Sequence, residues 1–220
     1  MSSQSCLVLI RHGQSTYNKK NIFTGWEDVE LTEQGVREAH DAAPLIANIN
    51  FTHAFTSNLI RAQHTLEIIL KSIQQNLLVT KDIALNERDY GSLVGQNKAE
   101  AAEKYGEKQV HIWRRSYATP PPGGESLEMA AKRSIPYFKS KIEPLLVKNN
   151  NIIISAHGNS IRSIVMHLHN ISSEKILQTE IGWCEPWIYT FKEGRKTGFK
   201  ILPRPGVESK SYLPETYKYI

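Results

Sequence analysis

Two short apolar runs in this chain each end in nearly the same polar tetrad. Residues 6–10 (CLVLI) precede Arg11 and the tetrad HGQS at 12–15, and residues 151–156 (NIIISA) precede the tetrad HGNS at 157–160. Apolar runs of this length, rich in β-branched and long aliphatic side chains, are typical of strands buried on both faces. The tetrads then follow the carboxyl ends of the strands, where ligands bind in open α/β sheets. If the two strands are neighbours, both imidazoles face one crevice.

A single histidine after a strand is most simply interpreted as a surface or capping residue. Two matched tetrads after two strands favour a shared site instead. Gly13 supports this interpretation, because glycine lets the chain turn sharply without a β-carbon in the way.

Composition limits the classes of partner. The chain has 220 residues and a net charge of +5, which suits an anionic substrate. Like charges do not gather in long blocks, so we do not expect nucleic acid as a partner. No run approaches the roughly 18 apolar residues of a membrane span, and the N-terminus lacks the basic region of a signal peptide. The two cysteines, Cys6 and Cys184, are too few for a disulfide framework and favour a cytoplasmic location.

A third strand, turn and helix unit begins at Phe51. Residues 51–55 predict a short strand, and Thr56-Ser57-Asn58 predicts the cap of a helix. Arg61 then falls in the first turn of that helix, at the same sheet edge as the tetrads; on its own it would be interpreted as a solvated surface arginine. An earlier helix is expected to start near Thr32 and to kink or end early at Pro44.

The polar segment 86–89 (NERD) contains Glu87, which we select as a proton carrier over the alternative of an exposed acidic loop. Asn97 predicts a helix cap with Glu100 reaching back, and this places Lys98 in a first turn that favours anions.

The whole pattern predicts an α/β fold, a three-layer αβα sandwich with a mostly parallel central sheet and antiparallel edge strands. The strands expected at 187–191 and 200–202 form that edge. Residues 1–202 are expected to form a single domain, and residues 203–220 a mobile C-terminal tail.

The cations near the predicted crevice are Arg11, Arg61, Lys98, Arg114 and Arg115. A small molecule with two phosphates and a carboxylate carries roughly −4 to −5, since each phosphate holds about −1.5 to −2. An imidazole inside such an anion site indicates phosphohistidine chemistry, in which a neutral ring attacks phosphorus and a carboxylic acid protonates the leaving oxygen. No metal-binding motif is present, and we expect no metal.

The segment LIRHGQS (9–15) resembles the signature of the histidine phosphatase superfamily, and AHGNS (156–160) resembles its second histidine motif. Further segments resemble the cofactor-dependent phosphoglycerate mutases in order: FTGW (23–26), LNER (85–88), GQNKAE (95–100), WRR (113–115) and GESL (124–127). The resemblance covers roughly residues 5–191.

The resemblance implies the roles of individual residues. His12 is the implied nucleophile, Glu87 the acid and base, and Arg11, Arg61 and His157 complete the catalytic group. The positions implied to bind substrate are Arg11, His12, Gly13, Gln14, Ser15, Asn18, Thr24, Gly25, Arg61, Glu87, Arg88, Asp89, Tyr90, Lys98, Arg114, Arg115, Gly158 and Asn159.

The implied reaction is the interconversion of 2-phosphoglycerate and 3-phosphoglycerate in glycolysis and gluconeogenesis. It passes through 2,3-bisphosphoglycerate, which also primes the enzyme. The alternatives are a phosphatase of the same fold acting on a small phosphate ester, and a binding module without catalysis. A homodimer and a monomer are both left open.

The sequence departs from many members of the mutase family at two places. Asp89 stands where many members have histidine, and some two dozen residues are missing before Gly124. The first change adds a carboxylate beside Glu87, and the second removes one expected wall of the site.

Overall fold

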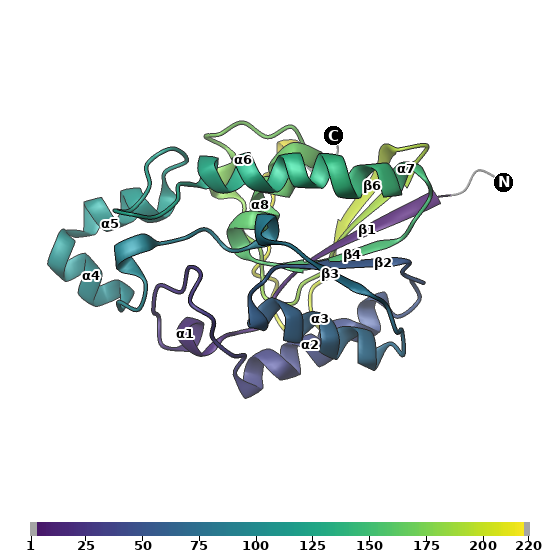
Figure 1. Cartoon of the computed structure of the whole chain (residues 1–220), viewed down its shortest axis with the longest axis horizontal. Helices are drawn as coiled ribbons and strands as arrows, with labels where there is room; N and C mark the ends of the chain where they lie inside the picture. Colours follow the sequence, from purple (N-terminus) through teal and green to yellow (C-terminus); the bar gives the residue numbers. More distant parts are fainter. Residues whose placement is uncertain (1–3, 218–220) are drawn as a thin grey trace.

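A six-stranded sheet in the order β3-β2-β4-β1-β5-β6 forms the centre of the protein (Figure 1). The structure is a computed structural model that describes residues 4–217. The strands are β1 (Gln4–Arg11), β2 (His53–Thr56), β3 (Val79–Lys81), β4 (Ile152–Ala156), β5 (Trp187–Lys192) and β6 (Arg195–Ile201).

The two strands that carry the tetrads are neighbours. β1 and β4 run parallel, with Leu7 opposite Ile152 and Arg11 opposite Ala156. β2 and β3 extend the parallel part beyond β4, whereas β5 pairs antiparallel with β1 and β6 antiparallel with β5. The predicted sheet, with its antiparallel edge, is therefore confirmed.

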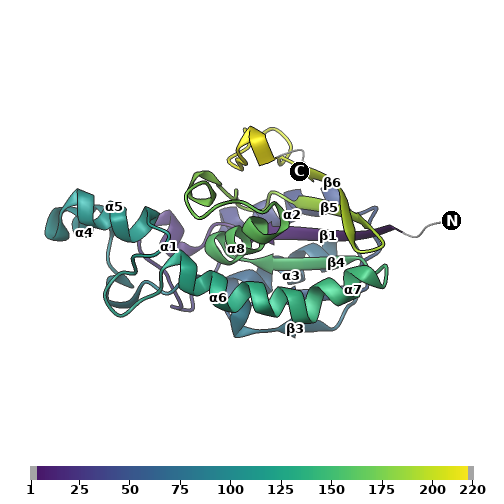
Figure 2. The same cartoon turned by 90° about the horizontal axis from the view of Figure 1, so that it is seen from above.

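Helices cover both faces of the sheet. α2 (Glu33–Ile46) and α3 (Ile60–Ser72) lie on one face, and α6 (Leu127–Tyr137), α7 (Glu143–Val147) and α8 (Gly158–Leu168) lie on the other (Figures 1 and 2). Side chains of β1 and β4 alternate between two apolar clusters, with Leu7 in one and Val8 in the other, because successive residues of a strand face opposite sides. This arrangement is the predicted three-layer sandwich.

The remaining helices extend from one end of the sandwich. α1 (Thr16–Lys19), α4 (Lys98–Tyr105) and α5 (Glu107–Arg115) lie beyond the carboxyl ends of the parallel strands (Figure 2). A small apolar cluster that includes Phe23 and Val110 joins them to the loop after α1. These helices therefore stand over the end of the sheet where the tetrads lie. None of the helices within residues 4–217 combines the length and apolar character needed to span a bilayer.

Three local predictions differ from the structure. Pro44 lies inside α2 without ending it early, because Ala42, Ala43 and Ile46 around it are buried in the core; the alternative of a kink at Pro44 stays a prediction. The cap of α3 is Leu59, whose backbone N–H donates to the Ser57 hydroxyl, rather than a side chain of residues 56–58. The short edge strand β3 was not predicted, because three residues provide too little alternation to recognise.

The described part of the predicted tail is docked on the domain. Leu213 is fully buried, and the Glu185 carboxylate accepts backbone N–H groups of Lys210 and Ser211. Glu180 and Tyr212 exchange two backbone hydrogen bonds of 2.9 Å. A docked conformation does not measure motion, so the mobility of this segment stays a prediction; residues 218–220 lie outside the described chain.

Gly13 and Gly35 bring the first tetrad against the start of α2 without room for a side chain. A β-carbon at Gly35 would lie 2.2 Å from the Gln14 carbonyl oxygen, and one at Gly13 would lie 2.3 Å from the Gly35 oxygen. The obstruction on both sides is backbone, which cannot rotate away.

We expect Gly35→Ala to lower the free energy of unfolding by about 1–3 kcal/mol, the usual cost of overpacking. Urea unfolding followed by circular dichroism measures this effect, with Arg37→Ala on the exposed face of α2 as the matched control. Equal stabilities of the two variants would contradict the close packing of this turn.

Candidate active site

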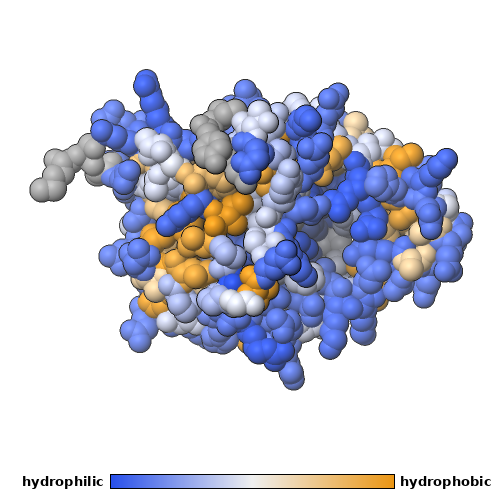
Figure 3. All heavy atoms as spheres, turned by 180° about the vertical axis from the view of Figure 1, so that it is seen from behind, coloured by the Kyte–Doolittle hydropathy of each residue, from blue (hydrophilic) through white to orange (hydrophobic). Residues whose placement is uncertain are grey.

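The carboxyl ends of all four parallel strands contribute to one polar cavity system. His12 follows β1, Arg61 follows β2, Glu87 follows β3 and His157 follows β4. An inner cavity of about 80 Å³ and an outer one of about 220 Å³ share the side chains of Arg11, Glu87, Tyr90 and Lys98. In Figure 3 hydrophilic side chains surround a hollow toward the part of the molecule that carries α4 and α5.

His12 has one free ring nitrogen. Its Nδ1 lies 2.7 Å from the Gly13 carbonyl oxygen, which can only accept, so Nδ1 carries the proton. Nε2 is therefore unprotonated in the neutral ring, and the side chain lines the inner cavity. Burial, followed by the charges of Arg61 and Arg11, holds the pKa of His12 well below its ordinary value.

His157 lies directly beside His12, with ring centroids 5.0 Å apart. Its Nε2 is 2.7 Å from the Ser57 hydroxyl, which already accepts the Leu59 N–H and so can donate to the ring. When Ser57 donates, Nδ1 bears the proton; this atom is buried and has no hydrogen-bond partner among the described residues. Burial and the charge of Arg61 also hold the pKa of His157 well below its ordinary value.

The two inner arginines are held by backbone carbonyls. Arg61 is buried and donates to the carbonyl oxygens of Gly25 and Glu27 at 2.8 and 2.9 Å, and Arg11 donates to that of Ile181 at 2.8 Å. Burial lowers the pKa of Arg61 to about 10, so it remains charged at neutral pH.

Glu87 presents one carboxylate oxygen to the protein and the other to the cavity. Oε1 accepts the Arg88 N–H at 2.7 Å, the Asn159 side-chain N–H at 2.9 Å and the Asn159 backbone N–H at 3.2 Å. Oε2 accepts none from residues 4–217 and would lie 3.8 Å from a β-carbon on Gly158. Asn159 in turn is oriented by Arg162, whose Nη1 donates to Asn159 Oδ1 at 2.7 Å.

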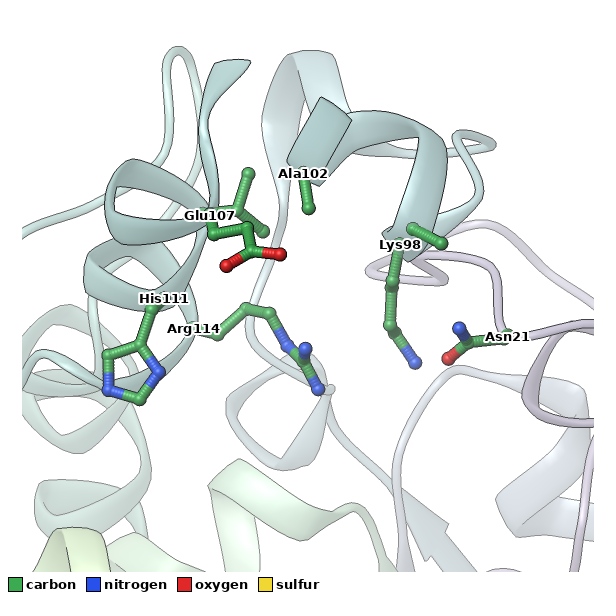
Figure 4. A pocket seen from close by; sticks show the side chains of 8 residues that line it. Asn21, Lys98, Ala102, Glu107, His111 and Arg114 are labelled. Atoms are coloured by element: carbon green, nitrogen blue, oxygen red, sulfur yellow. The ribbon is translucent and has the colours of Figure 1, made fainter. Parts of the chain in front are cut away.

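Cations from α4 and α5 line the outer part. Lys98 and Arg114 extend into the same side cavity of about 310 Å³ (Figure 4) and also line the outer cavity together with Arg115. Asn97 caps α4 as predicted, by accepting the Ala99 N–H. Burial lowers the pKa of Lys98.

The loop residues divide into those that line the cavities and those that do not. Asn18, Thr24 and Gly25 line the inner cavity, and Gly158 and Asn159 line the outer one. Asn18 uses its Oδ1 to accept from Ser15, and its amide NH₂ has no acceptor within residues 4–217.

The structure places five other predicted residues behind the cavity walls, in addition to His157, which lines neither cavity. The backbone N–H groups of Gly13, Gln14 and Ser15 donate hydrogen bonds within the protein. Their acceptors are the side chains of Thr65, Glu38 and Asn18 respectively. The Arg88 guanidinium packs against the face of the Tyr90 ring, with its central carbon 4.7 Å from the ring centroid. The Asp89 carboxylate accepts the Gly91 N–H and so shapes a turn. The residues concerned are Gly13, Gln14, Ser15, Arg88 and Asp89, whose contact with a substrate stays a prediction.

Two residues of the outer cavity were not predicted. Arg162 lies one helical turn after Asn159, and this i to i+3 spacing on α8 is a signal that the sequence offered. Glu180 comes from an irregular segment after the short helix Ile176–Gln178, and no local pattern marks it.

We expect both imidazoles to stay neutral at pH 6, where a free imidazole is mostly protonated. The unfolded chain binds these protons as the pH falls through about 6.5. The contribution of the two rings to the free energy of unfolding is therefore complete above about pH 6.5 and is lost progressively below that pH. Nitrogen-15 NMR of the imidazoles, assigned with His12→Gln and His157→Gln, tests this expectation, with the urea-unfolded chain as the control. A protonated ring in the folded protein at pH 6 would contradict it.

Comparison with known proteins places this site in a family. Residues 7–200 match the histidine phosphatase superfamily (branch 1). The 2,3-bisphosphoglycerate-dependent phosphoglycerate mutase of Nitrobacter hamburgensis is 52% identical over 202 residues, which are 90% of this chain and 98% of that protein. Because 98% of the Nitrobacter mutase aligns with this chain, that mutase does not contain an insertion of some two dozen residues relative to it. The short segment before Gly124 is therefore not peculiar to this chain.

Two solved structures share the fold at lower identity. The alpha-ribazole phosphatase from Shigella flexneri has a TM-score of 0.79 at 23% identity, over 93% of this chain and 100% of that one. The phosphoglycerate mutase from Bacillus anthracis has a TM-score of 0.69 at 23% identity, over 89% and 92% of the two chains. Phosphatases and mutases therefore share this architecture, so the fold does not distinguish the two classes of enzyme. The 52% sequence identity to the Nitrobacter mutase does distinguish them. The chain belongs to the histidine phosphatase superfamily and, within it, to the 2,3-bisphosphoglycerate-dependent phosphoglycerate mutases.

Proposed function

We propose that the protein interconverts 2-phosphoglycerate and 3-phosphoglycerate through a phosphohistidine and a 2,3-bisphosphoglycerate intermediate. The observation that carries this proposal is one cavity system with a free imidazole nitrogen at its inner end and several cations, among them Lys98, Arg114 and Arg115, at its outer end. A hydrolase needs the inner end alone, whereas a mutase must also hold the second anionic group of its substrate.

The inner end is suited to phosphoryl transfer to His12. Nε2 attacks the phosphorus of 2,3-bisphosphoglycerate, the N–P bond forms, and the bond from phosphorus to the leaving oxygen breaks. The Gly13 carbonyl, by accepting from Nδ1, stabilises the positive charge that develops on the ring. Because the resting pKa is low, the ring needs no deprotonation before it attacks.

Negative charge on the transferring group meets donors that are already in place. Arg11 and Arg61 line the inner cavity, and His157, whose Nδ1 has no partner among the described residues, lies behind it against His12. The two arginines are held by backbone carbonyls, so they need little rearrangement when charge moves onto the phosphoryl oxygens. Asn18 adds its free amide.

Glu87 is the proposed acid and base. Its free Oε2 faces the cavity beside Arg11, where it can protonate the leaving oxygen and then accept the proton of the attacking hydroxyl. The Asn159 amide holds Oε1, so the carboxylate keeps one orientation through both steps.

The outer cations hold the rest of the molecule. The carboxylate and the second phosphate of the bisphosphoglycerate bind Lys98, Arg114 and Arg115, and reorientation then presents the other phosphate to His12. In this scheme 2,3-bisphosphoglycerate also primes the resting enzyme, as the name of the Nitrobacter relative implies for that protein. A cytoplasmic location and a homodimer stay predictions.

The primed assay distinguishes mutase from phosphatase. We expect the protein, primed with 2,3-bisphosphoglycerate, to equilibrate the two monophosphoglycerates much faster than it releases inorganic phosphate. A charge-assisted hydrogen bond contributes about 1.5–3 kcal/mol, so Arg114→Ala should raise KM about tenfold or more with a smaller change in kcat. Lys104→Ala, on the neighbouring helix, serves as the control. Rapid phosphate release without equilibration would reject the mutase proposal.

The covalent step has its own test. Incubation with ³²P-labelled 2,3-bisphosphoglycerate should give a protein-bound phosphate that is labile in acid and stable in base. We expect the label to be absent in His12→Ala and unchanged in His40→Ala, a histidine on α2 outside the cavity. Label retained in His12→Ala would place the nucleophile elsewhere.

A further inference from the structure

The outer cavity contains a carboxylate of the protein's own at the place where an anionic ligand is expected. Glu180 Oε1 lies 2.5 Å from Arg115 Nη1, and Oε2 lies 3.4 Å from Arg162 Nη2. All three side chains line the cavity of about 220 Å³ that also contains Lys98 and Arg114. An acid placed among the cations of a wall weakens the attraction of that wall for anions.

The two arginines depend on Glu180 to different extents. Arg162 also donates to the Thr179 carbonyl at 2.9 Å and to Asn159 at 2.7 Å, so its place is fixed without the carboxylate. Arg115 has no other hydrogen-bond or ion-pair partner among residues 4–217, and its side chain is 41% exposed. Arg115 is therefore the cation that Glu180 occupies.

The backbone of Glu180 is fixed from the other side. Its N–H and carbonyl pair with those of Tyr212, at 2.9 Å each, where the C-terminal segment docks. The carboxylate thus faces the cavity from a paired stretch of backbone, although its side chain is 42% exposed. A surface acid that paired with Arg115 only by chance would not need this support.

We propose that Glu180 is an internal competitor that occupies Arg115 in the empty site and limits how tightly the outer wall holds the anionic groups of the substrate. This inference rests on the proposed function. A phosphate or carboxylate that binds Arg115 must displace Glu180 or share the guanidinium with it, and part of the binding energy is lost in either case. The consequence is faster release of monophosphoglycerate and bisphosphoglycerate, and a KM higher than the cations alone would give.

The decisive variant is Glu180→Gln, which keeps the shape of the side chain and removes its charge. We expect KM for both monophosphoglycerates, and the concentration of 2,3-bisphosphoglycerate needed for half-maximal priming, to fall about threefold to tenfold, with kcat unchanged or lower. A rise in these constants would show that Glu180 orients Arg115 for the substrate, and unchanged constants would show no competition; both results overturn the proposal.

A double-variant cycle tests whether the effect acts through Arg115. In an Arg115→Ala background, Glu180→Gln should change KM much less than it does in the wild-type chain, because the competed cation is gone. An undiminished effect would overturn competition at Arg115. Glu67→Gln removes an acid that is likewise paired with a basic side chain, Lys71, on α3, and should leave KM unchanged.

Binding without turnover separates this proposal from the mutase assignment. Calorimetric titration of 2,3-bisphosphoglycerate into His12→Ala, with and without Glu180→Gln, measures affinity when the nucleophile is absent. Tighter binding in the double variant supports competition even if the wild-type protein failed to interconvert the phosphoglycerates. Equal or weaker binding rejects it. Glu180→Asp, whose shorter side chain withdraws from Arg115, replaces Glu180→Gln if that variant does not fold, and it should also tighten binding.

Discussion

The parallel pairing of β1 with β4 is the interaction on which the site depends. It places Arg11 opposite Ala156, so the residues that follow, His12 and His157, leave the sheet at the same level with ring centroids 5.0 Å apart. A shift of one residue would turn every side chain of β4 to the opposite face and bury the wrong set. The apolar side chains on both faces of these strands therefore fix the distance between two rings that do not belong to the core.

The features that could be predicted from the sequence are those that depend on a few consecutive residues. The two tetrads could be recognised, because a buried strand and the polar turn after it are adjacent in the chain. Asn97 was recognisable as a helix cap, since this cap acts on an N–H group only two residues ahead. Local recognition of this kind, together with the family resemblance, was sufficient for the fold and for the residues around the inner cavity.

The parts that could not be predicted are held by contacts between distant segments. The Glu38 carboxylate accepts a hydrogen bond from the backbone N–H of Gln14 and forms an ion pair with Arg204. These three residues are distributed over most of the chain. Glu180 reaches the outer cavity from an irregular segment whose backbone pairs with Tyr212. Neither acid lies in a pattern with a fixed spacing, so only the three-dimensional arrangement shows that one supports the loop after His12 and the other faces the cations.

The inner and outer cations differ in how their charge is compensated, and this difference follows from their places in the fold. Arg61 and Arg11 come from the ends of buried elements, where backbone carbonyls accept hydrogen bonds from them without cancelling their charge. A full positive charge is thus retained beside two imidazoles that burial keeps neutral. Arg115 stands on an exposed helix end, where a carboxylate is free to approach and partly neutralises it. An anion that enters this site therefore meets inner arginines that have no ion-pair partner among residues 4–217, although Glu87 lines the same cavity, and an Arg115 that already shares its charge with Glu180. This difference favours a tighter hold on the group beside the inner arginines than on the group at Arg115.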